Sequence, residues 1–319
     1  MILTVTLNAA MDRTLTVPSF ALAHRHRASA SLALPGGKGV NVARALKRLE
    51  EPVIATGLAG GRTGTTIIEE LTAEGILNDF VHIREESRTS TAVIDPMVGG
   101  QTEINEQGPS VGEDELSLLL DKLHYLSKGA DLVVLAGSLP PDVPEDFYAT
   151  MLRHLREAKV VTAVDASGPP LRAALPAEPG IVSPNAREAE EIVGYEFQDD
   201  SDLAAGAEAL ERMGAGIALV HVPDGCIARF GGGRSGKTLR ARLEPQVDGV
   251  STVGSGDAFL AGFVASRYLG RSQLDCLAYG VACGAESTQH LGAGLVDPEQ
   301  VGRLRSEIEV ERPDVGAFS

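Results

Sequence analysis

The residue types best suited to chemistry gather in one short segment, Thr252-Val-Gly254-Ser255-Gly256-Asp257. Its two glycines permit a tight turn just before a long predicted helix over residues 256–269, so the amides of 254–257 should converge at the helix N-terminus. Such a nest binds an anion or stabilises a developing negative charge. Asp257 could simply complement the helix dipole, or it could be a general base that deprotonates a hydroxyl attacking a phosphoryl group. The residues alone support both interpretations equally.

A second glycine-rich loop, Pro35-Gly36-Gly37-Lys38-Gly39, leads into a predicted helix that contains Asn41. Three glycines around one lysine let the backbone approach a ligand closely while presenting a single positive charge. In the first turn of the helix, Asn41 could reach a sugar hydroxyl. The alternative is an ordinary turn and helix start with a solvated Lys38.

A third segment, Ser183-Pro184-Asn185-Ala-Arg-Glu188, joins a predicted strand to a predicted helix. Asn at the N-cap with Glu three residues later is a capping box, in which each side chain accepts a hydrogen bond from the other residue's backbone amide. This pairing accounts fully for the pattern, so the spacing alone gives Glu188 no catalytic role.

The basic cluster Arg25-His26-Arg27 and the isolated Arg88 stand out in an otherwise acidic chain. A charge cluster is usually a solvated face. Both basic positions nevertheless fall in segments that break the regular alternation of elements, and such segments could close over a phosphorylated substrate.

The segment Gly231-Gly-Gly-Arg-Ser-Gly236-Lys237-Thr238 matches the phosphate-binding P-loop pattern letter for letter. That motif requires a helix directly after the Lys-Thr pair. Residues 239–243 instead alternate with period two, and residues 226–230 before the glycines are also extended. The sequence therefore predicts a β-hairpin with a glycine-rich turn.

These segments require a scaffold, and short apolar β-branched runs that alternate with amphipathic stretches supply it. The pattern predicts an α/β fold, a doubly wound and mostly parallel sheet flanked by helices. Segments 13–34 and 88–107 are predicted to form a small antiparallel β lid, in which Gly99-Gly100 marks a hairpin. With no linker in the sequence, we expect one domain over residues 1–319.

The predicted strands cover residues 2–8, 53–59, 131–136, 160–165, 181–183 and 217–222. The predicted helices cover residues 40–49, 64–74, 113–127, 144–158, 186–193, 202–213, 256–269 and 273–289.

Composition restricts the possible partners. The chain has 319 residues, 28 basic and 44 acidic, for a net charge of −16. That balance argues against nucleic acid or an anionic membrane surface as the main partner, since both require a basic face. Three scattered cysteines give no disulfide framework or zinc spacing, and no apolar stretch is long enough to span a bilayer. We therefore expect a cytoplasmic protein.

Taken together, the motifs resemble the ribokinase-like (PfkB-type) sugar kinases, in the branch of 1-phosphofructokinase, tagatose-6-phosphate kinase and minor-type 6-phosphofructokinase. The resemblance covers nearly the whole chain. The segments that carry it are Thr6-Leu-Asn8-Ala-Ala-Met-Asp12, Gly36-Gly-Lys-Gly-Val-Asn41-Val, Thr102-Glu-Ile-Asn-Glu106-Gln-Gly-Pro109, Ala136-Gly-Ser138-Leu-Pro-Pro141, Pro184-Asn185-x-x-Glu188 and Thr252-Val-Gly-Ser-Gly-Asp257. Each is weak alone, but six in the family's order are specific.

The resemblance implies ATP-dependent transfer to a hydroxyl of a phosphorylated hexose, with fructose 1-phosphate favoured as acceptor, and a homodimer formed through the lid. It implies that Asp257 is the base and that the amides of Gly254, Ser255 and Gly256 form the anion hole. The implied substrate-binding residues are Asp12, Arg25, Gly37, Lys38, Asn41, Arg88 and Ser138, of which Arg25, Lys38 and Arg88 would face the phosphate already on the sugar. The implied nucleotide-binding residues are Asn185, Val222, Gly225, Gly254 and Gly256, with Asn185 and Glu188 organising Mg²⁺ through water.

Some positions depart from the family pattern. Ser183 stands where a lysine commonly precedes the Pro-Asn pair, and Val222 stands where a glycine is usual. The donor could accordingly be ATP, GTP or pyrophosphate, and the acceptor could also be tagatose 6-phosphate or fructose 6-phosphate. Two rival functions are a non-catalytic sugar-phosphate sensor and a P-loop NTPase that uses Lys237.

Overall fold

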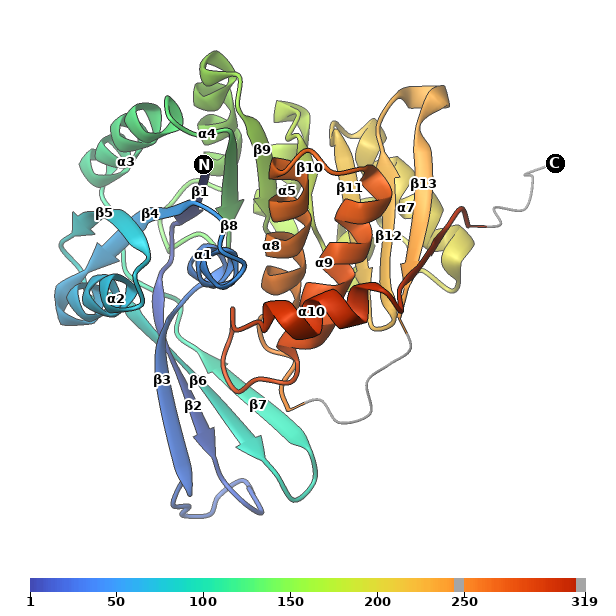
Figure 1. The fold of residues 1–319 in the computed structure, drawn as a ribbon. Coiled ribbons are helices and arrows are strands. Elements are labelled where there is room, and N and C mark those ends of the chain that lie inside the picture. The colour runs from blue at the N-terminus through green and yellow to red at the C-terminus, as the bar shows by residue number, and fades with distance from the viewer. Residues whose placement is uncertain (244–249, 314–319) are drawn as a thin grey trace.

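The computed structural model describes residues 1–243 and 250–313, which form an α/β body with a smaller sheet projecting from it (Figure 1). Within these residues the large sheet has ten strands in the order β14-β13-β12-β11-β10-β9-β8-β1-β4-β5. Neighbours from β11 to β5 run parallel, whereas β12, β13 and β14 are antiparallel. The bounds are β1 (Ile2–Thr6), β4 (Val53–Gly60), β5 (Leu77–Ile83), β8 (Leu132–Ala136), β9 (Val161–Asp165), β10 (Ile181–Val182), β11 (Ile217–Val222), β12 (Gly225–Phe230), β13 (Lys237–Arg242) and β14 (Glu309–Glu311).

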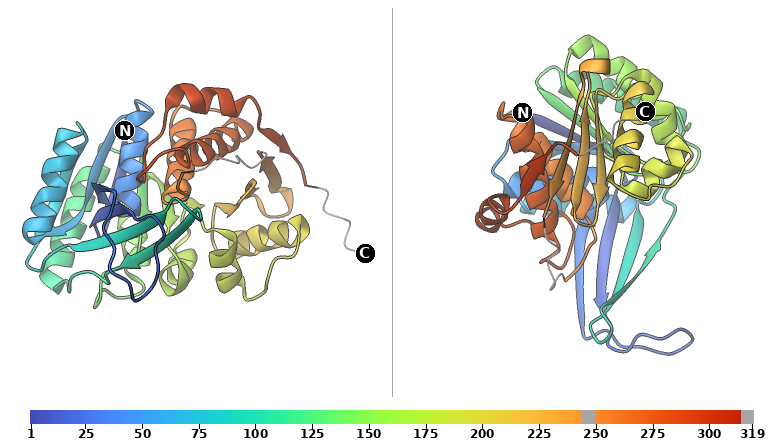
Figure 2. Two further views of the ribbon diagram at one scale, coloured as in Figure 1. Left: turned by 90° about the horizontal axis from the view of Figure 1, so that it is seen from below. Right: turned by 90° about the vertical axis from the view of Figure 1, so that its right-hand side faces the viewer.

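Helices cover both faces of this sheet, as the edge-on view in Figure 2 shows. One face carries α1 (Lys38–Arg48), α2 (Gly61–Ala73), α8 (Ser255–Tyr268), α9 (Gln273–Ser287) and α10 (Pro298–Arg305). The other carries α3 (Glu113–Ser127), α4 (Phe147–Leu155), α5 (Gly168–Ala174), α6 (Ala186–Val193) and α7 (Asp200–Arg212). Short 3-10 turns lie at η1 (Arg156–Ala158), η2 (Leu175–Ala177) and η3 (Gly233–Ser235). The doubly wound arrangement predicted from the sequence is thus confirmed.

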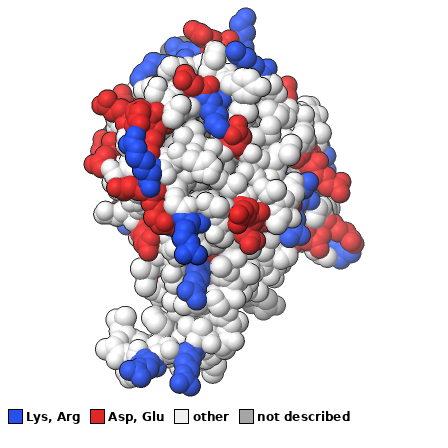
Figure 3. Space-filling view, turned by 90° about the vertical axis from the view of Figure 1, so that its left-hand side faces the viewer, with Lys and Arg blue, Asp and Glu red and all other residues white. Residues whose placement is uncertain are grey.

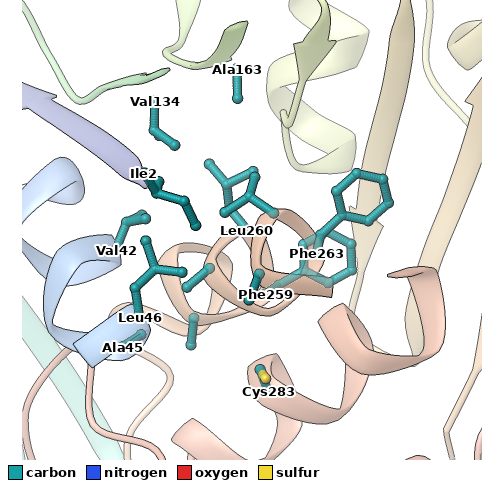
Figure 4. Packing of buried hydrophobic residues seen from close by; sticks show 14 of the residues in the cluster. Ile2, Val42, Ala45, Leu46, Val134, Ala163, Phe259, Leu260, Phe263 and Cys283 are labelled. Carbon is teal, nitrogen blue, oxygen red and sulfur yellow. The ribbon is translucent and has the colours of Figure 1, made fainter. Parts of the chain in front are cut away.

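Each face of the sheet has its own hydrophobic core because successive strand residues point to opposite sides. Ile2 and Val134 belong to the cluster under α1 and α8, whereas Leu3 and Val133 belong to the cluster on the other face. Figure 4 shows Ile2 and Val134 packed near Leu260 of α8. The first cluster packs α1 and α8 against one face of the sheet, and the second packs the helices of the other face against it.

The small sheet contains the two segments in which the sequence predicts a lid. Its order is β3-β2-β6-β7, with bounds β2 (Ala10–Thr16), β3 (Ala30–Gly36), β6 (Arg88–Asp95) and β7 (Gly100–Asn105). Two antiparallel hairpins are joined by a parallel pairing of β2 with β6. Residues 17–29 form the loop at its far end, where the Asp95 carboxylate accepts hydrogen bonds from the backbone amides of Ser19 and Phe20.

The glycine-rich segment at 231–238 is the turn of a hairpin between β12 and β13, as predicted. Lys237 begins β13 and is exposed, and no helix follows it. The anion-binding geometry of a P-loop is therefore missing at this position.

Across residues 1–243 and 250–313, no helix has the length and apolar character needed to cross a membrane.

Candidate functional site

One cavity of about 1190 Å³ lies where the carboxyl ends of the central strands meet the small sheet and the N-terminus of α8. Open α/β sheets commonly bind ligands at this edge. The cavity brings together almost every residue that the sequence singles out. Its predicted lining residues are Asp12, Gly37, Lys38, Asn41, Arg88, Ser138, Asn185, Glu188, Val222, Gly225, Gly254, Ser255, Gly256 and Asp257.

Arg25 is the one predicted substrate-binding residue that does not line this cavity. It is exposed in the loop of residues 17–29, at the end of the small sheet away from the body (Figure 1). Within a single chain, its guanidinium therefore lies apart from the other candidate groups.

The N-terminus of α8 contains the glycine turn in which the sequence predicts an anion nest. Gly254 is the N-cap and adopts φ +78, a left-handed conformation that favours glycine. A Cβ at this position would lie 2.5 Å from the Cβ of Ala293, so glycine is required by contact as well as by conformation. Ser255, Gly256 and Asp257 line the cavity, and their amides precede the first hydrogen bond of the helix, with the Ser255 amide donating to the Thr252 carbonyl at 3.3 Å.

Asp257, in the first turn of α8, is buried and held by α1. The Asn41 side-chain amide donates a 2.8 Å hydrogen bond to Asp257 Oδ2. Burial raises the pKa of Asp257 well above the usual carboxyl range, while the nearby positive charge of Lys38 acts in the opposite direction. A carboxyl poised in this way is suited to accept a proton near neutral pH.

Lys38 lies among carboxylates at the centre of the cavity. Its ammonium donates a 2.7 Å hydrogen bond to Asp165 and lies 4.0 Å from Glu188 Oε1. Burial would lower the pKa of Lys38, but the charges of Asp165, Asp257 and Glu188 raise it above its ordinary value. The lysine is therefore a fixed cation beside Asp257.

Asp12 and Arg88 lie together at the end of the cavity formed by the small sheet. Burial raises the pKa of Asp12 to about 6, against the opposing charges of Arg88 and Arg44. Arg88 Nε donates to the Asn8 carbonyl at 3.2 Å, and its Nη1 donates to Ser90 Oγ at 3.0 Å. This end therefore offers one carboxyl and one oriented guanidinium to a polar ligand.

Asn185 and Glu188 form the capping box predicted at the start of α6. Asn185 Oδ1 accepts from the Glu188 amide and Glu188 Oε2 accepts from the Asn185 amide, both at 2.9 Å. Glu188 Oε1, which the cap does not use, is on the side of Lys38. Among the described residues, no three His, Cys, Asp or Glu side chains cluster to hold a metal alone. One carboxylate oxygen outside the cap, Oε1 of Glu188, fits Mg²⁺ held mainly by phosphate and water.

Val222 and Gly225, at the turn between β11 and β12, differ in conformation. Val222 ends β11 and is not in the left-handed region. Gly225 adopts φ +137, and a Cβ there would lie 2.1 Å from the Ala241 carbonyl oxygen. Valine is therefore accommodated at position 222, because the backbone there is extended.

Sequence reasoning missed three polar features of the cavity. Asp165 ends β9, so its place at the carboxyl end of a predicted strand was an available signal. The other two are pairs, Asn8 Nδ2 with Ser138 Oγ at 3.2 Å and Ser183 Oγ with His221 Nε2 at 2.6 Å. The members of each pair are far apart in the chain, and no sequence pattern joins them.

The half-buried His221 is further fixed by an aromatic neighbour. Its ring packs edge-on against Phe259 of α8 with the ring centroids 4.2 Å apart. Burial lowers the pKa of His221 to about 4, so the imidazole is neutral near pH 7.

Known proteins resemble this chain in both sequence and fold. A family model described as pfkB family carbohydrate kinase matches residues 3–300. A 1-phosphofructokinase of Borreliella burgdorferi is 33% identical over 98% of both chains, and one from Rhodobacter capsulatus is 31% identical over 97% of both. A solved Thermotoga maritima structure, named as a possible 1-phosphofructokinase, superposes with a TM-score of 0.90 at 29% identity, covering 98% of this chain and 100% of that one. Because the family model and these relatives match nearly its full length, the chain belongs to the pfkB family of carbohydrate kinases.

Proposed function

We propose that this kinase is a 1-phosphofructokinase that transfers the γ-phosphoryl group of ATP to the C6 hydroxyl of fructose 1-phosphate, giving fructose 1,6-bisphosphate. The observation that carries the proposal is the buried Asp257 carboxyl, which is hydrogen-bonded to Asn41 beside the amides that begin α8. A base and an anion hole side by side are what in-line phosphoryl transfer requires. The names of the relatives support fructose 1-phosphate as the acceptor.

Asp257 would orient the acceptor hydroxyl and take its proton as the hydroxyl attacks. The amides of 254–257 would stabilise the negative charge on the transferred group. Lys38 would contribute its charge at the same place, because its ammonium is paired with Asp165 and is close enough to Asp257 to oppose the rise in its pKa. This position supports a role at the transferred phosphoryl group more than at the phosphate already on the sugar.

The acceptor would lie toward the small sheet. Asp12 would accept hydrogen bonds from sugar hydroxyls, and Arg88 would attract the sugar's own phosphate with the N–H groups it does not use on Asn8, Ser90 and the Glu106 carbonyl. Ser138, bonded to Asn8, would lie near the reacting end. Gly37 has no side chain to obstruct this approach.

The residues that would hold Mg²⁺ are Glu188, through the Oε1 that the capping box does not use, and Asn185 through water. The ion would neutralise charge on the donor phosphates during transfer. Val222 and Gly225 would border the nucleotide on the same side of the cavity.

Three buried free cysteines fit a reducing cytoplasm.

A homodimer formed through the small sheet, acting also as a lid, is part of the proposal. Exposed apolar side chains on its loops and outer strand support it: Leu22, Met97, Val98 and Ile104. On one chain Arg25 lies outside the cavity, so any contact with substrate would require a second subunit. Sedimentation of Ile104→Asp would test this interface, because a charge there should shift a dimer toward monomer. An unchanged mass would contradict it.

The activity is tested by ADP release with fructose 1-phosphate, fructose 6-phosphate or tagatose 6-phosphate as acceptor and ATP, GTP or pyrophosphate as donor. The proposal expects the highest kcat/KM for fructose 1-phosphate with ATP. A higher value for another sugar would change the acceptor within the family. Calorimetric binding of sugar phosphate without any binding of ATP would instead indicate a sensor.

A further inference from the structure

A hydrogen-bonded serine–histidine pair lies on the wall of the cavity and has no part in the reaction described so far. Ser183 Oγ and His221 Nε2 are 2.6 Å apart, and both residues line the cavity. Ser183 follows β10 and is 4% exposed, while His221 is on β11. The backbone of His221 is bonded to Pro184, so the pair is held by the sheet itself.

The surroundings of the pair place it on the nucleotide side of the cavity. Ser183 directly precedes Pro184 and Asn185, and His221 directly precedes Val222. The edge-on contact of His221 with Phe259 fixes the pair against α8, two residues after Asp257. The sugar side, by contrast, is formed by Asp12 and Arg88 on the small sheet.

The chemistry of the two groups allows only two arrangements of their protons. A neutral imidazole carries one N–H, and a hydroxyl has one proton to donate and lone pairs to accept. If Nε2 carries the proton, it donates to Ser183 Oγ, and the serine hydroxyl is free to donate into the cavity. If Nε2 is bare, the hydroxyl donates to it and only lone pairs remain for a ligand. Phosphate oxygens are acceptors, so they select the first arrangement.

We propose that Ser183 and His221 act together as a phosphate-binding pair for the nucleotide donor, with His221 Nε2–H donating to Ser183 Oγ and the Ser183 hydroxyl donating to a phosphate oxygen. This inference rests on the proposed function, because it needs a nucleotide on this side of the cavity. A neutral donor adds a hydrogen bond without burying another cation beside Lys38, which would be costly. Both residues are positioning groups for the donor and neither transfers the phosphoryl group.

The first test compares Michaelis constants for the two substrates. Ser183→Ala should raise KM for ATP by about tenfold or more, as expected for the loss of a hydrogen bond to a charged group. KM for fructose 1-phosphate should stay unchanged. Ser183→Thr, which keeps a hydroxyl, should restore most of the affinity for ATP. A rise confined to the sugar phosphate, or no rise at all, would overturn the proposal.

His221→Leu should raise KM for ATP to a similar extent, and the double variant Ser183→Ala/His221→Leu should be no worse than either single variant, because the two residues act as one unit. Ser127→Ala is the matched control, since it removes a buried hydroxyl at the end of α3, outside the cavity. Strictly additive effects of the two changes would contradict a shared role.

Binding of the non-hydrolysable analogue AMP-PNP separates this inference from the proposed acceptor. If the wild-type protein fails to phosphorylate fructose 1-phosphate, the acceptor assignment fails, but Ser183→Ala should still weaken AMP-PNP binding in calorimetry. The wild-type protein gives a direct test of the tautomer. In ¹⁵N NMR of labelled histidine, assigned through His221→Leu, the complex should show the Nε2–H tautomer. An Nδ1–H tautomer in the complex would overturn the proposal.

Discussion

The Asn41 side-chain amide donates a 2.8 Å hydrogen bond to Oδ2 of Asp257, although the two residues are 216 positions apart in the chain. This bond links the first turn of α1 to the first turn of α8 across the cavity. In the proposed reaction, the oxygen that Asn41 does not bond would be left for the acceptor hydroxyl. A general base oriented by a second side chain is the arrangement expected for proton abstraction during transfer.

Asp257→Asn should lower kcat by about 10²–10⁴-fold, the usual contribution of a general base. The amide keeps the size of the side chain but cannot accept the hydroxyl proton. Binding of fructose 1-phosphate, measured by calorimetry, should persist, because Asp12 and Arg88 remain. A variant with nearly normal kcat would show that Asp257 serves only the helix dipole.

Lys38→Met should lower kcat and shift the pH dependence of kcat. Burial raises the pKa of Asp257 and the charge of Lys38 opposes that rise, so removing the charge should raise the pKa further. The base works only when ionised, and kcat is therefore lost as the pH falls through this pKa. The acid limb of the profile of kcat against pH should move to higher pH in the variant, and kcat should partly recover at alkaline pH.

Lys237→Met is the matched control for that experiment, because this lysine is exposed on the β12–β13 hairpin and does not line the cavity. Its pH profile should equal that of the wild type. If Lys38→Met raised KM for phosphorylated sugars but not for free fructose, with the pH profile unchanged, Lys38 would be an anchor for the sugar's phosphate. Inactivation by Lys237→Met would revive the P-loop interpretation.

Asp12→Asn should stabilise the free protein while weakening sugar binding. Burial raises the folded-state pKa of Asp12 to about 6 from its ordinary 3.8, so between these pH values the folded state holds a proton that the unfolded state releases. The wild type therefore loses stability as the pH rises between these values. Near pH 7 the variant should gain on the order of 2 kcal/mol in free energy of unfolding, and the gain should vanish toward pH 4.

Denaturant unfolding at both pH values measures the effect, and calorimetry with fructose 1-phosphate measures the accompanying loss of affinity. An equal gain at both pH values would show that the charge of Asp12 is not its source. Unchanged sugar affinity would remove Asp12 from the acceptor site. The opposing effects on stability and binding are those of a group kept for function in an unfavourable environment.

The parts of the site that could be predicted are those contained in one local segment. The turn Gly254-Ser255-Gly256 and the capping box of Asn185 with Glu188 depend on neighbouring residues, and both have the expected geometry. The strands could be placed from apolar runs because each is buried on both faces. β5 was missed because it lies at the edge of the sheet and mixes polar with apolar residues.

Long-range partners could not be predicted. Lys38 meets Asp165 from 127 positions away, and nothing in the glycine loop indicates that its lysine is paired. Ser183 and His221 meet only because β10 and β11 are adjacent in the sheet. The position of Arg25 depends on where the small sheet ends, as Figure 3 illustrates with basic side chains at the tip of the projecting lobe, distant from the body. These relationships are properties of the tertiary structure.

Gly254→Ala and Gly256→Ala should separate the conformational requirement of the anion nest from its contact with substrate. Gly254 has φ +78, and an added Cβ would lie 2.5 Å from the Cβ of Ala293, so its substitution should cost about 1–3 kcal/mol of folding free energy and move the amides that we propose bind the transferred group. Gly256 is in the helical region, and its Cβ would meet nothing within 4 Å. The Tm of Gly256→Ala should therefore stay constant or rise, because alanine reduces the entropy of the unfolded chain. Thermal unfolding of both variants tests this difference, and an equal loss of Tm would show that the left-handed turn is not what the nest requires.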